Sequence, residues 1–329
     1  MKLPHRRQFL HLAASAAALP ALSRSAGAQT YPARPIRLVI PFPPGGSFDA
    51  IGRPWADKMK TLLGTVVVEN QGGASGTIAA TTVARAQPDG HILLLAGAGQ
   101  LGLYAITANR PLYDPVKDLQ PITVVAVTCY AIAVHPSLPA QNLRELVAYA
   151  KANPGKLSYG TAGVGSPNHL TGELFKSLTG ADVVHVPYRG AGPAIADAIS
   201  GQIPIVIPAT NGQLIELHRT GKLRILVVAA PERLLGAPEI PTAVEAGVPN
   251  LITQNLLSLV APAGTPKAIV DQIGAATRTA LADEKLQQQF ISSGFEPPRD
   301  RSPEAVRRWV EEEIARWTPI VKAIGLKLD

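Results

Sequence analysis

Glycine, serine and threonine residues gather at five short joins, and each join follows an apolar run typical of a strand. Joins of this kind expose backbone N–H groups, and a helix that starts there adds unpaired N–H groups at a positive dipole end. Such groups bind carboxylate or phosphate. A single glycine-rich join is usually only a tight turn, but five joins spread over both halves of the chain favour a ligand-binding cleft. The joins are PFPPGGSFD (41–49), ENQGGASGT (69–77), LAGAGQ (95–100), GTAGVGSPNHL (160–170) and VPYRGAGPA (186–194).

The joins do not complete a nucleotide-binding or catalytic motif. The segment 97–102 fits G-x-G-x-x-G after a strand, but Pro111 follows early and Asp118 lies in a turn-like segment, which disfavours a dinucleotide site. PFPPGGSFD lacks the lysine of a P-loop, and the chain has no G-x-S-x-G nucleophile elbow. The histidines after the N-terminal segment show no paired metal-ligand spacing. We therefore expect no catalytic residue, metal or cofactor, and an enzyme is the weaker hypothesis.

The first 28 residues have the pattern of an export signal. The arginine pair at 6 and 7 precedes a weakly apolar stretch at 12–22, and Ala26-Gly27-Ala28 fits an A-x-A cleavage site. The run RRQFL also resembles a twin-arginine signal, so the export route stays open between the general secretory and twin-arginine systems. The apolar stretch is far shorter than the ~20 residues of a membrane span. We predict a signal peptide at 1–28, cleaved near Ala28, and a periplasmic protein.

Export also changes the charge argument. The formal charge of the whole chain is +7, and removal of the four basic residues at 2, 6, 7 and 24, with no acidic residue among the first 28, lowers it to +3. Only 5% of the residues are aromatic, and the chain has no lysine- or arginine-rich block. These features do not support binding of nucleic acid, but they are compatible with a small anion as partner.

Short apolar runs alternate with helical patterns along the rest of the chain, which predicts an α/β fold with mainly parallel sheets. The run 122–134 is too long for one ordinary strand and could cross from one lobe to another, and 256–262 could be the return crossing. We therefore predict one lobe from 29–128 and 256–329 and a second lobe from 129–255. Strands are expected at 36–41, 66–70, 91–96, 122–134, 156–160, 182–186, 203–207, 222–230 and 256–262, and helices at 51–63, 77–86, 143–152, 170–178, 193–200, 266–282 and 303–324.

Seven longer segments occur in a fixed order: YPARPIRLVIPFPPGGSFD, VVVENQGGASG, AQPDGHILLLA, NPGKLSYGTAGVGSPNHL, HVPYRGAGPA, GKLRILVVAA and EIPTAVEAGVP. In this order they resemble the Bug family, the periplasmic solute receptors of tripartite tricarboxylate transporters, and the resemblance runs from about Tyr31 to the C-terminus. It implies a type II periplasmic-binding-protein fold, in which two α/β lobes close over a ligand. It also implies a non-enzymatic, monomeric receptor for a small organic carboxylate, with membrane transporter components as partners. A sensing partner of a signalling system remains an alternative that the sequence does not separate from transport.

The resemblance also implies where the ligand binds. In this family one carboxylate group is typically held by backbone N–H groups and hydroxyls of two loops, with bridging waters, and those loops match PFPPGGSFD and TAGVGSPNHL. Asp49 could cap a helix, fix waters, or accept from a ligand hydroxyl or ammonium group. Phe42 could equally pack in the core, and His169 could tie its own loop. The residues implied are Phe42, Gly45, Gly46, Ser47 and Asp49 on the first lobe, and Thr161, Ala162, Gly163, Ser166, Asn168, His169 and Tyr188 on the second.

The chain departs from the family pattern at four places on the expected cleft wall. Gln71 replaces a basic residue common in the family, and Pro204 replaces an acidic residue often found there. The segment 205–213 lacks the usual acidic or aromatic residues, and 97–100 lacks the usual hydroxyls. These positions lie away from the two shared loops, so they leave open what the far end of the ligand is.

Overall fold

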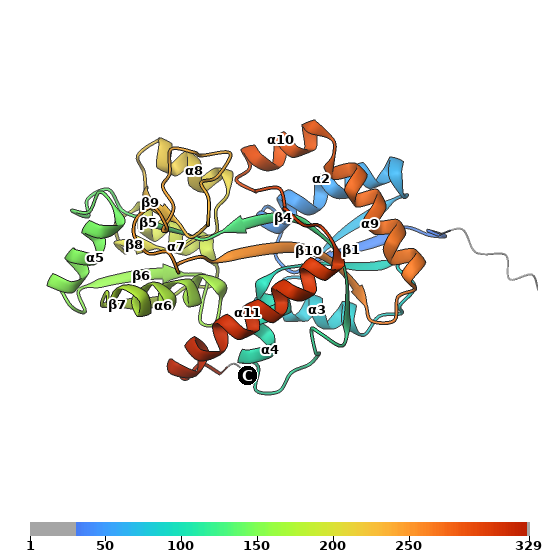
Figure 1. Ribbon diagram of the computed structural model, residues 1–329, viewed down its shortest axis with the longest axis horizontal. Helices are drawn as coiled ribbons and strands as arrows, with labels where there is room; N and C mark the ends of the chain where they lie inside the picture. Colours follow the sequence, from blue (N-terminus) through green and yellow to red (C-terminus); the bar gives the residue numbers. More distant parts are fainter. Residues whose placement is uncertain (1–30, 328–329) are drawn as a thin grey trace, which may run out of the picture. The chain divides into compact units, whose positions relative to one another are not determined.

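The computed structural model describes residues 31–327 and contains two five-stranded sheets (Figure 1). Their strand orders, β2-β1-β3-β10-β4 and β7-β6-β8-β5-β9, have the same pattern of pairing. In each sheet one strand, β10 or β5, is antiparallel to both of its neighbours, so the other four strands run in one direction. The first sheet contains β1 (Ile36–Ile40), β2 (Val66–Asn70), β3 (Ile92–Ala96), β4 (Leu119–Cys129) and β10 (Gln254–Pro262), and the second contains β5 (Ala131–Val134), β6 (Leu157–Thr161), β7 (Val183–Pro187), β8 (Ile205–Val206) and β9 (Arg224–Val228).

Most of the longer helices begin at a residue whose side chain caps the first turn. Asn142, Ser166, Asn211, Asp283 and Ser302 each accept a hydrogen bond from a backbone N–H three residues later. The helices are α2 (Ser47–Leu62), η1 (Ala74–Gly76), α3 (Thr77–Ala84), η2 (Gly99–Leu103), α4 (Tyr104–Thr107), α5 (Leu143–Ala152), α6 (Pro167–Thr179), α7 (Ala191–Ile199), α8 (Gly212–Arg219), α9 (Lys267–Leu281), α10 (Glu284–Ser292) and α11 (Pro303–Ala323).

Two neighbouring strand segments connect the sheets. The apolar run at 122–134, which is too long for one ordinary strand, forms the end of one strand and the whole of another: β4 ends at Cys129 in the first sheet and β5 begins at Ala131 in the second. Tyr130 lies between them and donates its N–H to Thr253 O just before β10, which pairs with β4 along its length. Figure 1 shows β4 and β10 side by side, at the edge of the first sheet from which the chain passes to the second. The lobe limits 29–128, 129–255 and 256–329 remain a proposal.

The long helix α11 contributes to two separate hydrophobic cores. Trp309 packs with residues of β1, β3 and β4, whereas Trp317 packs in the core that contains β5 and β6. Between them, Glu313 is 2% exposed and accepts from Trp317 Nε1 at 2.7 Å. Arg316 lies 3.1 Å from Glu313 Oε1 and donates to Ile252 O at 2.9 Å. Since Ile252 lies two residues before the start of β10, this group of contacts ties α11 to the region between the sheets.

The sequence reading misses two helices, α8 and α10, and the helical segment formed by η2 and α4. Helix α2 also begins earlier than expected, at Ser47 instead of Ile51. Within residues 31–327, no helix is long and apolar enough to cross a membrane and no cluster of metal-binding side chains is found. The predicted signal peptide at 1–28 lies outside the described residues.

Candidate ligand-binding site

The two loops singled out by the sequence occupy equivalent places in the two sheets. One follows β1 and leads into α2, and the other follows β6 and leads into α6. β1 lies between β2 and β3, and β6 lies between β7 and β8, so each loop leaves the carboxyl end of the second strand in its sheet. In open α/β sheets, ligands bind at the carboxyl ends of strands where the strand order reverses, as it does here.

The loop after β1 presents backbone donors to its surroundings. Gly45 has a φ of +86°, in the left-handed region that favours glycine, and Gly46 occupies the N-cap of α2 without a side-chain cap. Among residues 31–327, the N–H groups of Gly46 and Ser47 have no hydrogen-bond partner. Both glycines are exposed and Ser47 is half-buried. These N–H groups and the Ser47 hydroxyl are therefore available to an anion at the helix start.

Asp49 holds this loop in place. Its Oδ2 accepts from Gly45 N at 3.1 Å and from Arg53 Nε at 2.8 Å, and its Oδ1 accepts from Asn70 Nδ2 at 3.1 Å. Asn70 Nδ2 also donates to Phe42 O at 2.9 Å. Burial alone would raise the pKa of Asp49, but the hydrogen bonds from Arg53, Gly45 and Asn70 outweigh burial and lower that pKa below its usual value. The carboxylate is thus ionised and committed to the loop.

Aromatic rings connect this loop to the join after β3. The rings of Phe42 and Phe48 lie 4.9 Å apart, tilted by 51°. A Cβ atom on Gly97 would stand 3.1 Å from the Phe48 ring and 2.5 Å from Asn255 Oδ1, so only glycine fits there. Asn255, on β10, also accepts from Ala98 N at 2.7 Å. Sequence reasoning did not identify Asn255, which lies far along the chain from this join.

The join at 69–77 lies against the same region. Gln100 Nε2 donates to Ser75 O at 2.7 Å, and Gln100 Oε1 accepts from Gly97 N at 3.1 Å. The side chain of Gln100 is 1% exposed and fills the space where a Cβ on Gly76 would stand 2.4 Å away. The structure therefore brings together the three glycine-rich joins of the first sheet.

Hydroxyl groups shape the second loop, which follows β6. Ser166 is the N-cap of α6, where its Oγ accepts from His169 N at 3.3 Å and donates to Gly163 O at 2.7 Å. Thr161 Oγ1 accepts from Gly163 N at 3.2 Å. Thr161, Ser166 and His169 are buried, so these side chains shape the loop from within. Among residues 31–327, the N–H groups of Ala162 and Val164 have no hydrogen-bond partner, and they are the donors that this loop leaves open.

Asn168 and Tyr188 make contacts that fasten the second loop to neighbouring elements. Asn168 Nδ2 donates to Ile207 O at 2.7 Å, just after β8. Tyr188 donates its N–H to Thr161 O at 3.1 Å and its hydroxyl to Asp197 Oδ2 at 2.7 Å. Burial and the hydrogen bond to Asp197 raise the pKa of Tyr188 to about 12. Tyr188 therefore stays neutral, and its ring lies near Gly160, beside α7.

Residues 51–326 of the chain match the model of the tripartite tricarboxylate transporter family receptors. The chain belongs to this family. It is 34% identical to Protein BugT of Bordetella pertussis over 305 residues, which cover 92% of each chain. It is also similar to two solved structures from Rhodopseudomonas palustris. Rpa4515 with adipate is 33% identical, with a TM-score of 0.82 over 90% of this chain and 99% of that one. MatC with bound malate is 33% identical, with a TM-score of 0.79 over 88% of this chain and 100% of that one.

Membership of the tripartite tricarboxylate transporter receptors explains the architecture. The two sheets with their helices form the two α/β lobes of a periplasmic binding protein, as the sequence predicts. Proteins of this family bind a solute and are not enzymes, and they are periplasmic. The G-x-G-x-x-G match at 97–102 accordingly serves the fold: Gly97 admits Asn255 and Phe48, and Gly99–Leu103 forms a π-helical turn.

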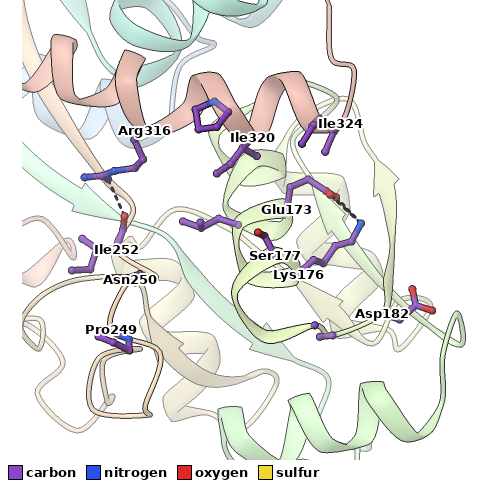
Figure 2. Close-up of a pocket in the computed structure, with 15 residues that line it drawn as sticks. Glu173, Lys176, Ser177, Asp182, Pro249, Asn250, Ile252, Arg316, Ile320 and Ile324 are labelled. Carbon is purple, nitrogen blue, oxygen red and sulfur yellow. Dashed lines mark hydrogen bonds and ion pairs between the residues drawn. The ribbon is translucent and has the colours of Figure 1, made fainter.

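A partly buried polar cluster beneath the second loop of this receptor was not predicted as a unit. His169 and His185 stack with ring centroids 3.9 Å apart, and Tyr159 donates its hydroxyl to Glu173 Oε1 at 2.6 Å. Glu173 also pairs with Lys176 at 3.0 Å, a contact marked in Figure 2. One signal was present in the sequence: in VVHVP the alternation of strand side chains puts His185 on the same face as buried Val183.

A cavity of about 1000 Å³ lies elsewhere in the receptor, between α6, α11 and residues 249–252 (Figure 2). None of the twelve residues predicted to bind ligand lines it. Its wall is largely apolar, and the basic groups labelled there are already engaged, Lys176 with Glu173 and Arg316 with Ile252 O. The two loops place open backbone N–H groups at the carboxyl ends of strands, whereas this cavity is mostly apolar, so the loops are the better candidate for an anion.

Proposed function

We propose that this protein is a periplasmic receptor that binds a small organic carboxylate between the loops 41–46 and 161–166. The observation that carries the proposal is that both loops leave the same strand position of their sheets and both keep backbone N–H groups without partners among residues 31–327. The relatives described with adipate and with bound malate support a carboxylate as ligand.

The residues divide into those that bind and those that shape. The N–H groups of Gly46 and Ser47 and the Ser47 hydroxyl donate from the first lobe, and the N–H groups of Ala162 and Val164 donate from the second. Neutral donors of this kind hold a carboxylate without a buried basic residue. The shaping residues are Asp49, Thr161, Gly163, Ser166 and His169, while Phe42, Gly45, Asn168 and Tyr188 complete the surroundings of the two loops.

Ligand that touches both loops would favour the closed arrangement of the lobes, since it gains contacts only there. The lobes are 29–128 with 256–329, and 129–255, joined where β4 passes into β5 and where β10 returns. The receptor acts as a monomer after removal of the signal peptide near Ala28. It delivers the carboxylate to the membrane components of a tripartite tricarboxylate transporter and binds no nucleic acid.

The test uses the mature chain, residues 29–329, in a thermal-shift screen followed by calorimetry. The panel contains acetate, malate, adipate, citrate, glutamate and aspartate, with NAD as the probe for the enzyme alternative. A ligand at a hundredfold excess over its Kd stabilises the folded state by about 2.7 kcal/mol. A rise in melting temperature with one or more carboxylates is expected, whereas a response to NAD alone would overturn the proposal.

Two substitutions at Ser47 separate the hydroxyl from the N–H. Ser47→Ala removes only the hydroxyl. Ser47→Pro also removes the N–H, and the fold should tolerate proline because Ser47 is the first helical residue and Gly46 has an extended ψ of 178°. Carboxylate affinity is expected to fall in both variants and to fall further in the proline variant. Equal affinities in wild type and Ser47→Pro would remove the first loop from the site.

A further inference from the structure

Two stacked imidazole rings brace the second loop at two places. The ring centroids of His169, on α6, and His185, on β7, lie 3.9 Å apart with an interplanar angle of 20°. His169 Nδ1 lies 3.2 Å from the backbone nitrogen of Gly165, and His185 Nε2 lies 2.6 Å from Thr161 Oγ1. The pair therefore reaches the loop near both of its ends.

The contact with Gly165 fixes the protonation of His169. A backbone N–H can only donate, so Nδ1 must accept and must carry no proton. The single proton of the neutral ring then sits on Nε2, which lies 3.8 Å from Glu173 Oε1. In a doubly protonated His169, the Nδ1–H would face the Gly165 N–H, so both groups would be donors and the hydrogen bond to Gly165 would be lost.

The contact with Thr161 acts one step further along the loop. Thr161 Oγ1 accepts from Gly163 N, so His185 fixes the hydroxyl that in turn fixes Gly163. Gly163 and Gly165 have φ values of +127° and +74°, in the region that only glycine adopts easily. Glycine backbone is flexible, so the shape of this loop depends on the side chains that bond to it, among them those of His169 and Thr161. The open N–H groups of Ala162 and Val164 lie beside these two braced glycines.

The surroundings keep the pair neutral. From α6, Glu173 and Lys176 face the rings and are paired with each other, and from β6 Tyr159 stacks obliquely on His185 at 5.1 Å and bonds Glu173. On α11, Arg316 is engaged with Glu313. Burial foremost lowers the pKa of His169, and burial together with the neighbouring His169 lowers the pKa of His185 to about 4. The acidic Asp197, on α7, accepts a hydrogen bond from the Tyr188 hydroxyl.

We propose that His169 and His185 are a pair of positioning residues that hold the loop 161–166 in the shape that presents its N–H groups to ligand, and that they do so only while His169 Nδ1 is unprotonated. The inference rests on the proposed function for the identity of the ligand. It adds His185 to the residues that shape the site. It also makes ligand binding sensitive to acid through His169, which need not touch the ligand.

The first test needs no ligand. Imidazole ¹⁵N NMR of the mature chain at about pH 7.5 is expected to show His169 protonated on Nε2 and bare on Nδ1. On acidification, the amide signal of Gly165 should shift together with the titration of His169 Nδ1. A proton on Nδ1 at neutral pH, or a Gly165 amide that ignores the titration, would overturn the proposal. This result stands whether or not a carboxylate binds.

The second test measures the Kd of malate and of adipate between about pH 7.5 and about pH 5. His169→Asn keeps an acceptor near the Nδ1 position but does not titrate, and His169→Leu removes the acceptor. His135→Asn is the control, because it makes the same change at a histidine that bonds Ser137 and not the loop 161–166. Protonation of malate or adipate itself changes the Kd equally in every variant. Differences between variants in the pH dependence of the Kd therefore come from the protein.

Wild type and His135→Asn are expected to lose more affinity on acidification than His169→Asn does. His169→Leu should bind weakly at every pH. Equal acid sensitivity in wild type and His169→Asn would contradict the proposal. If neither probe, nor any other carboxylate of the panel, binds wild type, the proposed function fails while the NMR result still decides the role of the histidine pair.

Discussion

Asp49 Oδ2 accepts a hydrogen bond from the backbone N–H of Gly45 at 3.1 Å, across the start of helix α2. An acidic side chain in the first turn of a helix is usually placed to cap it or to favour its dipole. Here the carboxylate instead reaches back past the N-cap Gly46, so that the N–H groups of Gly46 and Ser47 stay open. An acidic residue therefore helps to build the proposed anion site, because it orients the donors and leaves them unoccupied.

Replacement of Asp49 by asparagine is expected to weaken this site. The change removes the negative charge that accepts hydrogen bonds from Gly45 N and Arg53. One of the oxygens becomes an amide NH₂ group, so a neighbouring donor loses its acceptor. We expect a loss of about 1–2 kcal/mol in the free energy of unfolding and about tenfold in carboxylate affinity. Urea unfolding and calorimetry measure the two effects.

The matched control for that substitution is Asp57→Asn on the same helix. Asp57 pairs with Lys60 on the exposed side, where 72% of the aspartate side chain is accessible. Exposed pairs of this kind contribute little to stability. Neither stability nor affinity should change measurably, and an equal effect at both positions would show that Asp49 acts only through the general charge of the helix.

His185 makes the stability of the fold depend on pH. Its pKa is lowered to about 4 in the folded protein by burial and by the adjacent His169, against an ordinary value of 6.5. The unfolded chain therefore binds the proton more readily, so the stabilisation is complete above about pH 6.5 and is lost as the pH falls through about 4. Urea unfolding of His185→Gln across this window should give a shallower loss than wild type. If the free energy of unfolding falls equally with pH in both proteins, His185 is not responsible for the pH dependence. Carboxylates whose protonation also destabilises the fold affect both proteins equally, so they do not alter the comparison.

Cys129 is expected to be inert in the folded protein. It is 2% exposed at the end of β4, and burial raises the pKa of its thiol to about 12. Only the thiolate reacts readily, and little forms at neutral pH. A thiol-specific reagent should label the chain only after unfolding in urea. Rapid labelling of the native protein, or a disulfide-linked dimer under oxidising conditions, would disprove this expectation.

The two loops could be found from sequence because their signals are local. Ser166 followed by Pro167 marks the start of α6, three residues before the range expected from the apolar pattern, since serine caps helices and proline suits the first helical residue. The join after β1 likewise stands directly between a strand pattern and a helix pattern. Helix α8 could also have been found, because Asn211 caps it and Leu214 and Ile215 form its buried face.

Other parts of the site depend on contacts that no local pattern encodes. Asn255 reaches Ala98 across 157 positions, and His185 reaches Thr161 from the neighbouring strand. The break at Tyr130 is hidden because apolar residues continue on both sides of it. Helix α10 is mostly polar and buries only Leu286 and Phe290, so its apolar pattern is weak.

Substitutions at Glu313 and Arg316 test how α11 stabilises the region between the sheets. Glu313 is 2% exposed, and burial raises its pKa while Trp317 and Arg316 offset only part of that effect. Arg316→Ala removes the positive partner and the bond to Ile252 O, so the buried carboxylate loses compensation. We expect a loss of about 2 kcal/mol in the free energy of unfolding, since an uncompensated buried charge is costly and Arg316 is itself partly exposed.

In the double variant with Glu313→Gln, the buried charge is absent and part of that loss should be recovered, because the amide still accepts from Trp317. A double-mutant cycle by urea unfolding measures the coupling, and strictly additive effects would mean that Arg316 acts through Ile252 alone.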